Sequence, residues 1–239
     1  MKNILIVGGG TAGWLAANVI AARHSRADHS GVKVSVLESS DIPIIGVGEG
    51  TWPTMRNTVR EIGIDEKELF RSCCAAFKQG EKFVNWVHGN GDFYYHPFTV
   101  PLGYGRVDLA PYLDRIEDFA VSSNFQHHLC EAGLAPRGLN DPDFQGPCNY
   151  AYHLDSVKLG ILLQKHCVEK LQVKHIIDHV DKVTSTTDGD IQGLVTQSNG
   201  EISGDLFIDC TGLSSRLLGQ HFNIPFISKK STFFNDTAL

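Results

Sequence analysis

The sequence of 239 residues lacks features that would point to several classes of protein. Its N-terminus, Met1–Asn3 followed by Ile4–Val7, has too short an apolar run for a signal peptide or a membrane span. The six cysteines show neither a CxxC pair nor a regular metal-ligand spacing, and the adjacent Cys73 and Cys74 would rarely reach disulfide geometry. We therefore expect a cytoplasmic protein with free thiols and no bound metal.

The chain also lacks an excess of one charge, an internal repeat and any low-complexity tract. Charged residues make up 20%, and the formal net charge is −6 at pH 7. This balance gives no electrostatic reason to bind nucleic acid or an anionic membrane, and we expect neither. Apolar residues make up 42%, which is enough to bury a core in one large or two small domains of a soluble protein.

A glycine-rich loop follows the first expected strand, Ile4–Val7. It has the sequence GGGTAG at 8–13, with the spacing G-x-G-x-x-G, and an expected helix at 12–23 follows it. Gly8 permits a tight turn, Gly10 lets the backbone approach a pyrophosphate, and Gly13 lets the helix pack closely on the strand. The helix N-terminus offers free amides and the positive end of its dipole to phosphates.

The next expected strand, Val32–Glu38, ends in an acidic residue. Glu38 lies 25 residues beyond Gly13, where its carboxylate can accept hydrogen bonds from ribose hydroxyls and disfavours a 2′-phosphate. Strand, helix and strand form a βαβ unit, which implies a parallel sheet. The unit predicts dinucleotide binding and leaves the choice between FAD and NAD open.

The rest of the chain has an irregular middle and a regular end. We expect short helices at 53–62 and 65–76, loops with short helices over 94–150, a helix at 155–171, a strand at 174–180, a hairpin of 182–187 and 191–197 around Asp188-Gly189-Asp190, and a buried strand at Leu206–Asp209. This organisation predicts a single nucleotide-binding domain built from two segments, about 1–50 and 155–225. An insertion at about 51–154 would contribute to a substrate region.

A second glycine-rich stretch leaves the expected sheet and has the sequence IPIIGVGEGTWP at 42–53. Gly46, Gly48 and Gly50 leave the backbone bare, so that it can lie flat against a bulky planar ligand. Pro43 and Pro53 favour a rigid segment over a flexible loop.

This stretch resembles the flavin-dependent tryptophan halogenases, in which I-P-x-I-G-V-G-E-A-T-x-P follows the second strand. Gly50 stands where that family usually has alanine. Further blocks that resemble the family in the same order are GGTAGW at 9–14, AFK at 76–78, KFVNW at 82–86, YHLD at 152–155 and DLFIDCTG at 205–212. Thr211 stands where related aromatic hydroxylases usually carry aspartate, which favours a halogenase over a hydroxylase.

The resemblance implies an α/β fold and a set of cofactor residues. The fold is an FAD-binding Rossmann-like parallel sheet of the p-hydroxybenzoate-hydroxylase-like (GR2) type, with a β-hairpin layer and an inserted, mostly helical or loop substrate region. The expected FAD-binding residues are Gly8, Gly10, Thr11, Ala12, Gly13, Glu38, Gly46, Val47, Gly48, Glu49, Thr51, Val180, Thr211 and Gly212.

The same resemblance implies a reaction. In the family, FADH2 and O2 give a flavin hydroperoxide, which chloride or bromide converts to hypohalous acid that must not leak into water. Lys78 matches the lysine that hydrogen-bonds the hypohalous acid or forms a haloamine, and Lys82 is a competing candidate. His96 and Phe98 match residues that line an indole pocket. The implied function is halogenation of an electron-rich aromatic, tryptophan or another indole.

The resemblance also bears on partners and completeness. A separate NAD(P)H flavin reductase would supply FADH2, and a homodimer is one option for the assembly. The family's chains are about twice as long and carry W-x-W-x-I-P and a catalytic glutamate in a second half that is missing here, so we expect a C-terminally incomplete chain. An FAD-dependent aromatic monooxygenase, a catalytically inactive FAD-binding fragment and an NAD dehydrogenase remain as alternatives.

Overall fold

The computed structural model describes residues 1–24, 31–43, 46, 48–115 and 118–233. The chain divides into two compact units. The first unit combines Met1–Ile45 with Leu163–Leu239, and the second unit is Gly46–Leu162. Each unit is described by itself.

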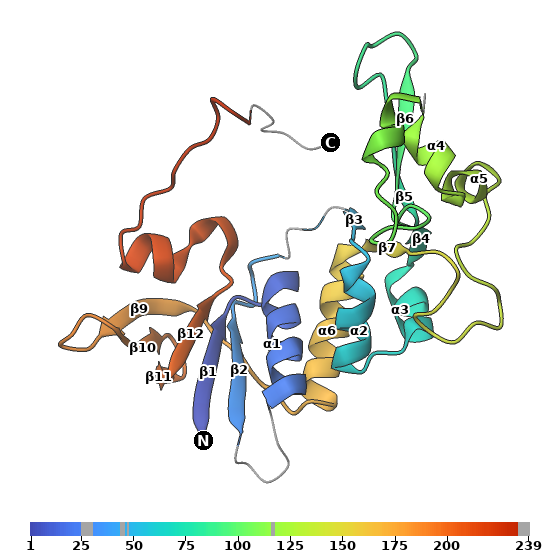
Figure 1. Ribbon diagram of the computed structural model, residues 1–239. Coiled ribbons are helices and arrows are strands. Elements are labelled where there is room, and N and C mark those ends of the chain that lie inside the picture. The colour runs from blue at the N-terminus through green and yellow to red at the C-terminus, as the bar shows by residue number, and fades with distance from the viewer. Residues whose placement is uncertain (25–30, 44–45, 47, 116–117, 234–239) are drawn as a thin grey trace. The chain divides into compact units, whose positions relative to one another are not determined.

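The first unit is built on a four-stranded sheet in the order β12-β1-β2-β8, of which β12, β1 and β2 are labelled in Figure 1. Its strands are β1 (Lys2–Val7), β2 (Val32–Glu38), β8 (Lys174–Ile177) and β12 (Leu206–Asp209). All three pairings are parallel, and in β1 Ile4 lies opposite both Val34 of β2 and Leu206 of β12. The predicted α/β fold with a parallel sheet is confirmed, and strands from both ends of the sequence share it.

Helix α1 (Thr11–His24) packs on β1 and β2. Its buried side chains include Trp14 and Ala17, which are at most 1% exposed. The part of α6 (Ser156–Glu169) from Leu163 onward belongs to the same unit. The buried Asn18 ties the helices together, because its Nδ2 donates to the carbonyl oxygens of Trp14, at 2.8 Å, and Leu163, at 2.9 Å.

A second, antiparallel sheet in the order β11-β10-β9 adds the predicted hairpin layer. Its strands are β9 (Val180–Ser185), β10 (Ile191–Thr196) and β11 (Gly200–Ser203). The buried residues Leu5, Val7, Leu37, Ile176, Leu194 and Leu217 form one apolar cluster with this layer. After β12 follow a 3-10 turn, η2 (Gly212–Ser214), and a π-helical turn, η3 (Arg216–His221).

Two sequence predictions in this unit need correction. The strand expected at 174–180 is two strands, because Asp178 ends the first one: its carboxylate accepts hydrogen bonds from the amides of Ser198 and Asn199 and so redirects the chain into the hairpin layer. The strand at Leu206–Asp209 was expected to be buried. It lies at the edge of the four-stranded sheet instead, and Leu206 is 52% exposed.

The second unit contains two small antiparallel sheets. One has the order β3-β7-β4 and the other pairs β5 with β6. The strands are β3 (Gly48–Gly50), β4 (Ala76–Lys78), β5 (Gly80–Val84), β6 (Phe93–Pro97) and β7 (Ala151–Asp155). The helices are α2 (Thr54–Ile62), α3 (Glu66–Cys73), η1 (Ala110–Arg115), α4 (Phe119–Ser123) and α5 (Gln126–Glu131).

The helix expected at 65–76 is shorter, and strands occur where loops were expected. Cys74 has a left-handed backbone (φ 49°), and the amide of Ala75 donates to the carbonyl oxygen of Phe70, which ends α3 and frees Ala76 for β4. Residues 94–97 belong to β6, because they pair with β5. Sequence periodicity did not show this strand because its partner lies nine or more residues away across an irregular loop.

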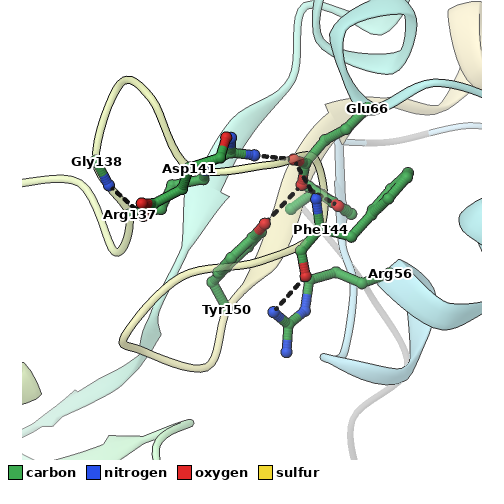
Figure 2. A network of polar contacts seen from close by, with 8 residues as sticks. Arg56, Glu66, Arg137, Gly138, Asp141, Phe144 and Tyr150 are labelled. Atoms are coloured by element: carbon green, nitrogen blue, oxygen red, sulfur yellow. Dashed lines mark hydrogen bonds and ion pairs between the residues drawn. The ribbon is translucent and has the colours of Figure 1, made fainter.

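A buried polar network joins α3 to β7 (Figure 2). The side chain of Glu66 is 2% exposed and accepts hydrogen bonds from the hydroxyls of Tyr150, at 2.8 Å, and Tyr152, at 2.7 Å. It also accepts from the amide of Phe144 at 2.8 Å and pairs with the guanidinium of Arg137. Because β7 pairs with β4, this network fixes the strand that ends in Lys78.

The cysteines and the character of the helices were both considered in the sequence predictions. All six cysteines are free. In the described ranges, none of the helices has the length and apolar character that crossing a bilayer requires.

Candidate dinucleotide site and lysine site

The glycine-rich loop of the first unit requires glycine where the sequence places it. Gly8 has a φ of 112°, and a Cβ there would lie 2.2 Å from the carbonyl oxygen of Cys210. A Cβ on Gly13 would lie 1.9 Å from the carbonyl oxygen of Gly8. Both distances are far below van der Waals contact, so any side chain at these positions would push the loop away from β12 or from α1.

Gly10 differs from these two glycines, because no heavy atom lies within 4 Å of a Cβ built on it. Among the described residues, the first amide of α1 with a protein acceptor is that of Trp14, which donates to the carbonyl oxygen of Gly10 at 3.1 Å. The amides of Thr11, Ala12 and Gly13 precede it at the positive end of the helix. Bare backbone, open space and free amides together fit a pyrophosphate.

The carboxylate of Glu38 lies against this loop. A Cβ on Gly9 would lie 1.4 Å from Oε2 of Glu38, so the carboxylate occupies the space beside the loop backbone. Its other oxygen, Oε1, accepts from Nε2 of His175 at 2.6 Å and from Nε2 of Gln164 at 3.1 Å. Sequence analysis missed both partners, because they come from β8 and α6, more than 120 residues away, and neither belongs to a motif.

Thr211 and Gly212 follow β12 near the same loop. The hydroxyl of Thr211 donates to Oδ1 of Asp209 at 2.6 Å and accepts from the amide of Arg216 at 2.9 Å, so its hydrogen bonds serve the protein. Gly212 has a φ of 63° and open space at its Cβ position. The carbonyl oxygen of Val180 accepts from the guanidinium of Arg216. The carbonyl oxygen of Gly212 accepts from the amide of Ser215, so the open space at its Cβ position is the part of this turn that remains accessible to a ligand.

Asp209, which sequence analysis also missed, organises this turn. Its Oδ2 accepts from the amides of Leu217, at 2.8 Å, and Leu218, at 3.0 Å. Burial acts to raise the pKa of Asp209, but the hydrogen bonds from Thr211, Leu217 and Leu218 outweigh it and lower the pKa. The ionised carboxylate thus holds the chain as it leaves the sheet.

In the second unit, the other glycine-rich stretch has both tight and open positions. A Cβ on Gly46 would lie 2.1 Å from Oγ of Ser156, whereas no atom lies within 4 Å of a Cβ on Gly48. Val47 lies outside the described residues. Glu49 is in β3. Oγ1 of Thr51 donates to the carbonyl oxygen of Tyr152 in β7 at 3.2 Å and accepts from its amide at 3.0 Å, so that side chain anchors the end of the stretch.

Lys78 ends β4 in a nearly closed environment. Its side chain is 10% exposed, and its Nζ donates to Oε1 of Glu81 at 3.0 Å. The same Nζ lies 5.4 Å from the ring centroids of both Trp52 and Phe98, within the range of cation–π attraction. A Cβ on Gly50 would lie 3.4 Å from this nitrogen.

The two predicted substrate residues lie beside this lysine. Phe98 is 7% exposed, and its ring centroid lies 5.4 Å from that of Trp52. His96 lies opposite Glu81 in the β5–β6 pair, and its ring centroid lies 6.4 Å from that of Trp52. The fold therefore brings Lys78, His96 and Phe98 together within the second unit. It adds Trp52 and Glu81, which the sequence analysis did not assign.

Lys82 belongs to a different cluster. Its Nζ donates to Oε1 of Glu131 at 2.9 Å and lies over the rings of Phe93 and Tyr95. Glu81 and Lys82 are neighbours in β5, and successive side chains of a strand point to opposite faces. No group of three or more potential ligands among the described residues could hold a metal ion.

Comparison with known proteins identifies the family of the chain. The tryptophan halogenase profile matches residues 3–239. The chain belongs to the tryptophan halogenase family.

Individual members of this family confirm the relationship over the whole chain. The chain is 32% identical to the tryptophan 7-halogenase RebH of Lentzea aerocolonigenes, covering 100% of this chain and 48% of that protein. The tryptophan 6-halogenase ThaL of Streptomyces albogriseolus gives the same figures. A tryptophan halogenase structure from Shewanella frigidimarina has a TM-score of 0.92 and 46% identity, covering 99% of this chain and 47% of that chain. This member of the family thus spans about half the length of the relatives it matches.

Proposed function

We propose that the whole protein catalyses FADH2- and O2-dependent halogenation of an electron-rich aromatic ring, with tryptophan or another indole as substrate. Membership of the tryptophan halogenase family supports this proposal. So does the similarity to Tar14, a flavin-dependent tryptophan C-6 halogenase (chlorinase), at 32% identity and a TM-score of 0.87. The observation that carries the proposal is the nearly buried Lys78 nitrogen beside the rings of Trp52 and Phe98.

The chain's own residues fit FAD. In the first unit, the amides of Thr11–Gly13 and the open backbone at Gly10 would hold the pyrophosphate, and Glu38 would hold the ribose. In the second unit, the bare backbone at Gly48 offers a flat surface for a ring. Reduced FAD, when bound, supplies hypohalous acid from O2 and a halide ion.

Lys78 would then direct the hypohalous acid to the substrate. Its side-chain nitrogen can donate a hydrogen bond to the oxygen of the acid, which makes the halogen more electrophilic. Trp52 and Phe98 can pack against a planar ring, since aromatic rings favour offset-stacked or edge-to-face contacts. His96, whose side chain is 57% exposed, would lie at the edge of the same site. The buried ring of Phe98, 7% exposed, would keep water from one side of the Lys78 nitrogen and so limit the loss of hypohalous acid to solvent.

The test is an assay of the whole protein with tryptophan or indole, chloride or bromide, FAD and a separate NAD(P)H-dependent flavin reductase. We expect a halogenated product, and Lys78→Met is expected to keep the FAD titration and lose the product. Lys82→Met is expected to keep the product, because its side chain belongs to the Glu131 cluster. A hydroxylated product would favour a monooxygenase, and normal FAD binding with no product would mean an inactive flavin-binding protein.

A further inference from the structure

Glu81 lies between the two polar side chains assigned to the substrate site. Its Oε1 accepts from Nζ of Lys78 at 3.0 Å, and its Oε2 lies 3.9 Å from Nδ1 of His96. The three residues come from three strands, β4, β5 and β6, and β5 and β6 hold Glu81 and His96 directly opposite each other. Cross-strand pairs of this kind fix side chains relative to one another. One carboxylate therefore bridges two side chains of the proposed site.

Three neighbours of the Lys78 nitrogen attract positive charge. The carboxylate of Glu81 lies on one side, and the ring faces of Trp52 and Phe98 lie at equal distances of 5.4 Å. Both kinds of neighbour stabilise an ammonium more strongly than a neutral amine, because the ammonium carries the positive charge. Two histidines of the described residues also lie in this neighbourhood: His96, opposite Glu81, and His153 of β7, whose ring lies 3.5 Å from a Cβ built on Gly50.

Partial burial strengthens the attraction between Lys78 and Glu81. The side chain of Lys78 is 10% exposed and that of Glu81 is 33% exposed, so water screens the pair less than it screens an ion pair on the open surface. The pair of Lys82 and Glu131, with exposures of 39% and 55%, is such a surface pair in the same unit. The chain thus contains a screened and a less screened lysine–glutamate pair for direct comparison.

We propose that Glu81 is a positioning residue that keeps Lys78 in its ammonium form and aims it between Trp52 and Phe98. This inference rests on the proposed function and chooses between the two roles that the family resemblance left open for the lysine. Forming a haloamine requires the neutral amine: RNH2 + HOCl gives RNHCl + H2O. An ammonium held by a carboxylate has no lone pair for this reaction, and it keeps two N–H donors for other partners.

The consequence for the chemistry is that chlorine passes straight from the hypohalous acid to the ring. The aromatic carbon forms the bond to chlorine, the O–Cl bond breaks, and the proton lost from the ring ends in water: ArH + HOCl gives ArCl + H2O. Lys78 donates a hydrogen bond to the departing oxygen, and Glu81 keeps that donor charged and in place. No covalent bond to Lys78 is needed.

Chemical labelling of the lysines tests this inference without flavin or turnover. The whole protein is labelled with limiting acetic anhydride between pH 7 and 11. The chymotryptic peptide 78–83 contains both Lys78 and Lys82, and its fragmentation in the mass spectrometer shows which of the two carries the label. Only the neutral amine reacts, so labelling at pH 8 relative to pH 11 measures the protonated fraction independently of access. In Glu81→Gln, Lys78 should be labelled about fivefold faster at pH 8, whereas Lys82 should be unchanged.

The matched control is Glu131→Gln, which removes the partner of Lys82 in the same way. It should leave the labelling of Lys78 unchanged. Glu81→Asp keeps the charge with one methylene less, so its Lys78 labelling should fall between the parent and Glu81→Gln, and circular dichroism checks that each variant is folded. Equal pH profiles of Lys78 in the parent and in both Glu81 variants would overturn the inference.

A second measurement separates this inference from the proposed function. During turnover with chloride, the Lys78 peptide of the parent is examined for replacement of one hydrogen by chlorine. A chlorinated Lys78 on the route to product would overturn the inference while supporting halogenation. The expected labelling shift in a protein that forms no halogenated product would leave Glu81 as the partner of Lys78 and would refute the proposed function instead.

Discussion

Replacing Glu66 by glutamine should loosen the second unit specifically. Glu66 accepts hydrogen bonds from two tyrosine hydroxyls and one backbone amide and also pairs with Arg137, all beneath a surface that leaves it 2% exposed (Figure 2). Glutamine has nearly the same size, so the substitution creates no cavity. It replaces one acceptor oxygen by an NH2 group and removes the negative charge.

The magnitude follows from what the substitution leaves unpaired. Arg137 is 11% exposed, and breaking a buried ion pair from one side typically costs 3–5 kcal/mol. The remaining amide oxygen of glutamine can still accept from Tyr150 or Tyr152, and Arg137 keeps its bond to the carbonyl oxygen of Asp141. We therefore expect the free energy of opening to fall by about 3 kcal/mol, the lower end of that range.

Buried thiols report this opening without assuming that the two units unfold together. Cys73 lies in α3 with Glu66, and Cys167 lies in the first unit; both are 0% exposed. Burial raises the pKa of Cys73 to about 11 and that of Cys167 to about 12, so both react with iodoacetamide mainly after opening. In Glu66→Gln, Cys73 should be labelled about a hundredfold faster, because each 1.4 kcal/mol is a factor of ten.

The controls make the expectation specific. Cys167 should be labelled at the parent rate in the same sample. Tyr150→Phe removes one hydroxyl and should raise the labelling rate of Cys73 only about fivefold, which corresponds to about 1 kcal/mol for one hydrogen bond. If Cys73 in Glu66→Gln reacted no faster than in Tyr150→Phe, the buried charge would not stabilise the unit and the reasoning would be wrong.

Three further predictions concern the loop, the alkaline limit and the lysine site. Gly8→Ala should lower the thermal midpoint of unfolding, because a φ of 112° and a Cβ 2.2 Å from a carbonyl oxygen cost about 2 kcal/mol or more. Gly10→Ala, whose Cβ meets open space, should melt like the parent and bind FAD more weakly in a flavin-fluorescence titration. Burial and the hydrogen bond to Glu66 raise the pKa of Tyr150 to about 12, above the value of about 10 in the unfolded chain. The contribution of Tyr150 to the free energy of unfolding is therefore complete below pH 10 and is lost as the pH rises to 12. Urea unfolding at pH 9, 10 and 11 should show this decline, and a flat profile would contradict it. Gly50→Ala places a methyl group 3.4 Å from the nitrogen of Lys78, so it should fold normally and raise the unfolding free energy by about 0.5 kcal/mol; a loss of more than about 1 kcal/mol would show that the contact is a clash.

The sequence predicted the regular elements of the first unit closely. The expected strand Val32–Glu38 has the bounds of β2, and the expected hairpin around Asp188-Gly189-Asp190 joins β9 to β10. These elements can be predicted from local sequence, because alternation, helical spacing and turn residues involve only a few neighbouring positions. The errors fall where a distant partner decides the structure: β6 exists through β5, and Asp178 ends β8 through the amides of Ser198 and Asn199.

The same division holds for the candidate sites. The glycine loop and the acid that ends the second strand indicated phosphate and ribose binding at Gly8, Gly10 and Glu38 from the residues themselves, and the family resemblance implied the roles of Lys78 and Phe98. No motif named the partners that orient these residues. His175 holds Glu38, Asp209 holds Thr211, and Glu81 holds Lys78, each through a side-chain contact.

The sequence by itself determined the family and the glycine loop, because these depend on the spacing of residues a few positions apart, and the family resemblance predicted the lysine. Only the tertiary structure decided that Glu81 and His96 face each other across two strands and that Glu66 collects its donors from residues about 70 to 86 positions away. Register and burial depend on which strands pair and which charges lose water. Those are properties of the folded chain and not of any one segment.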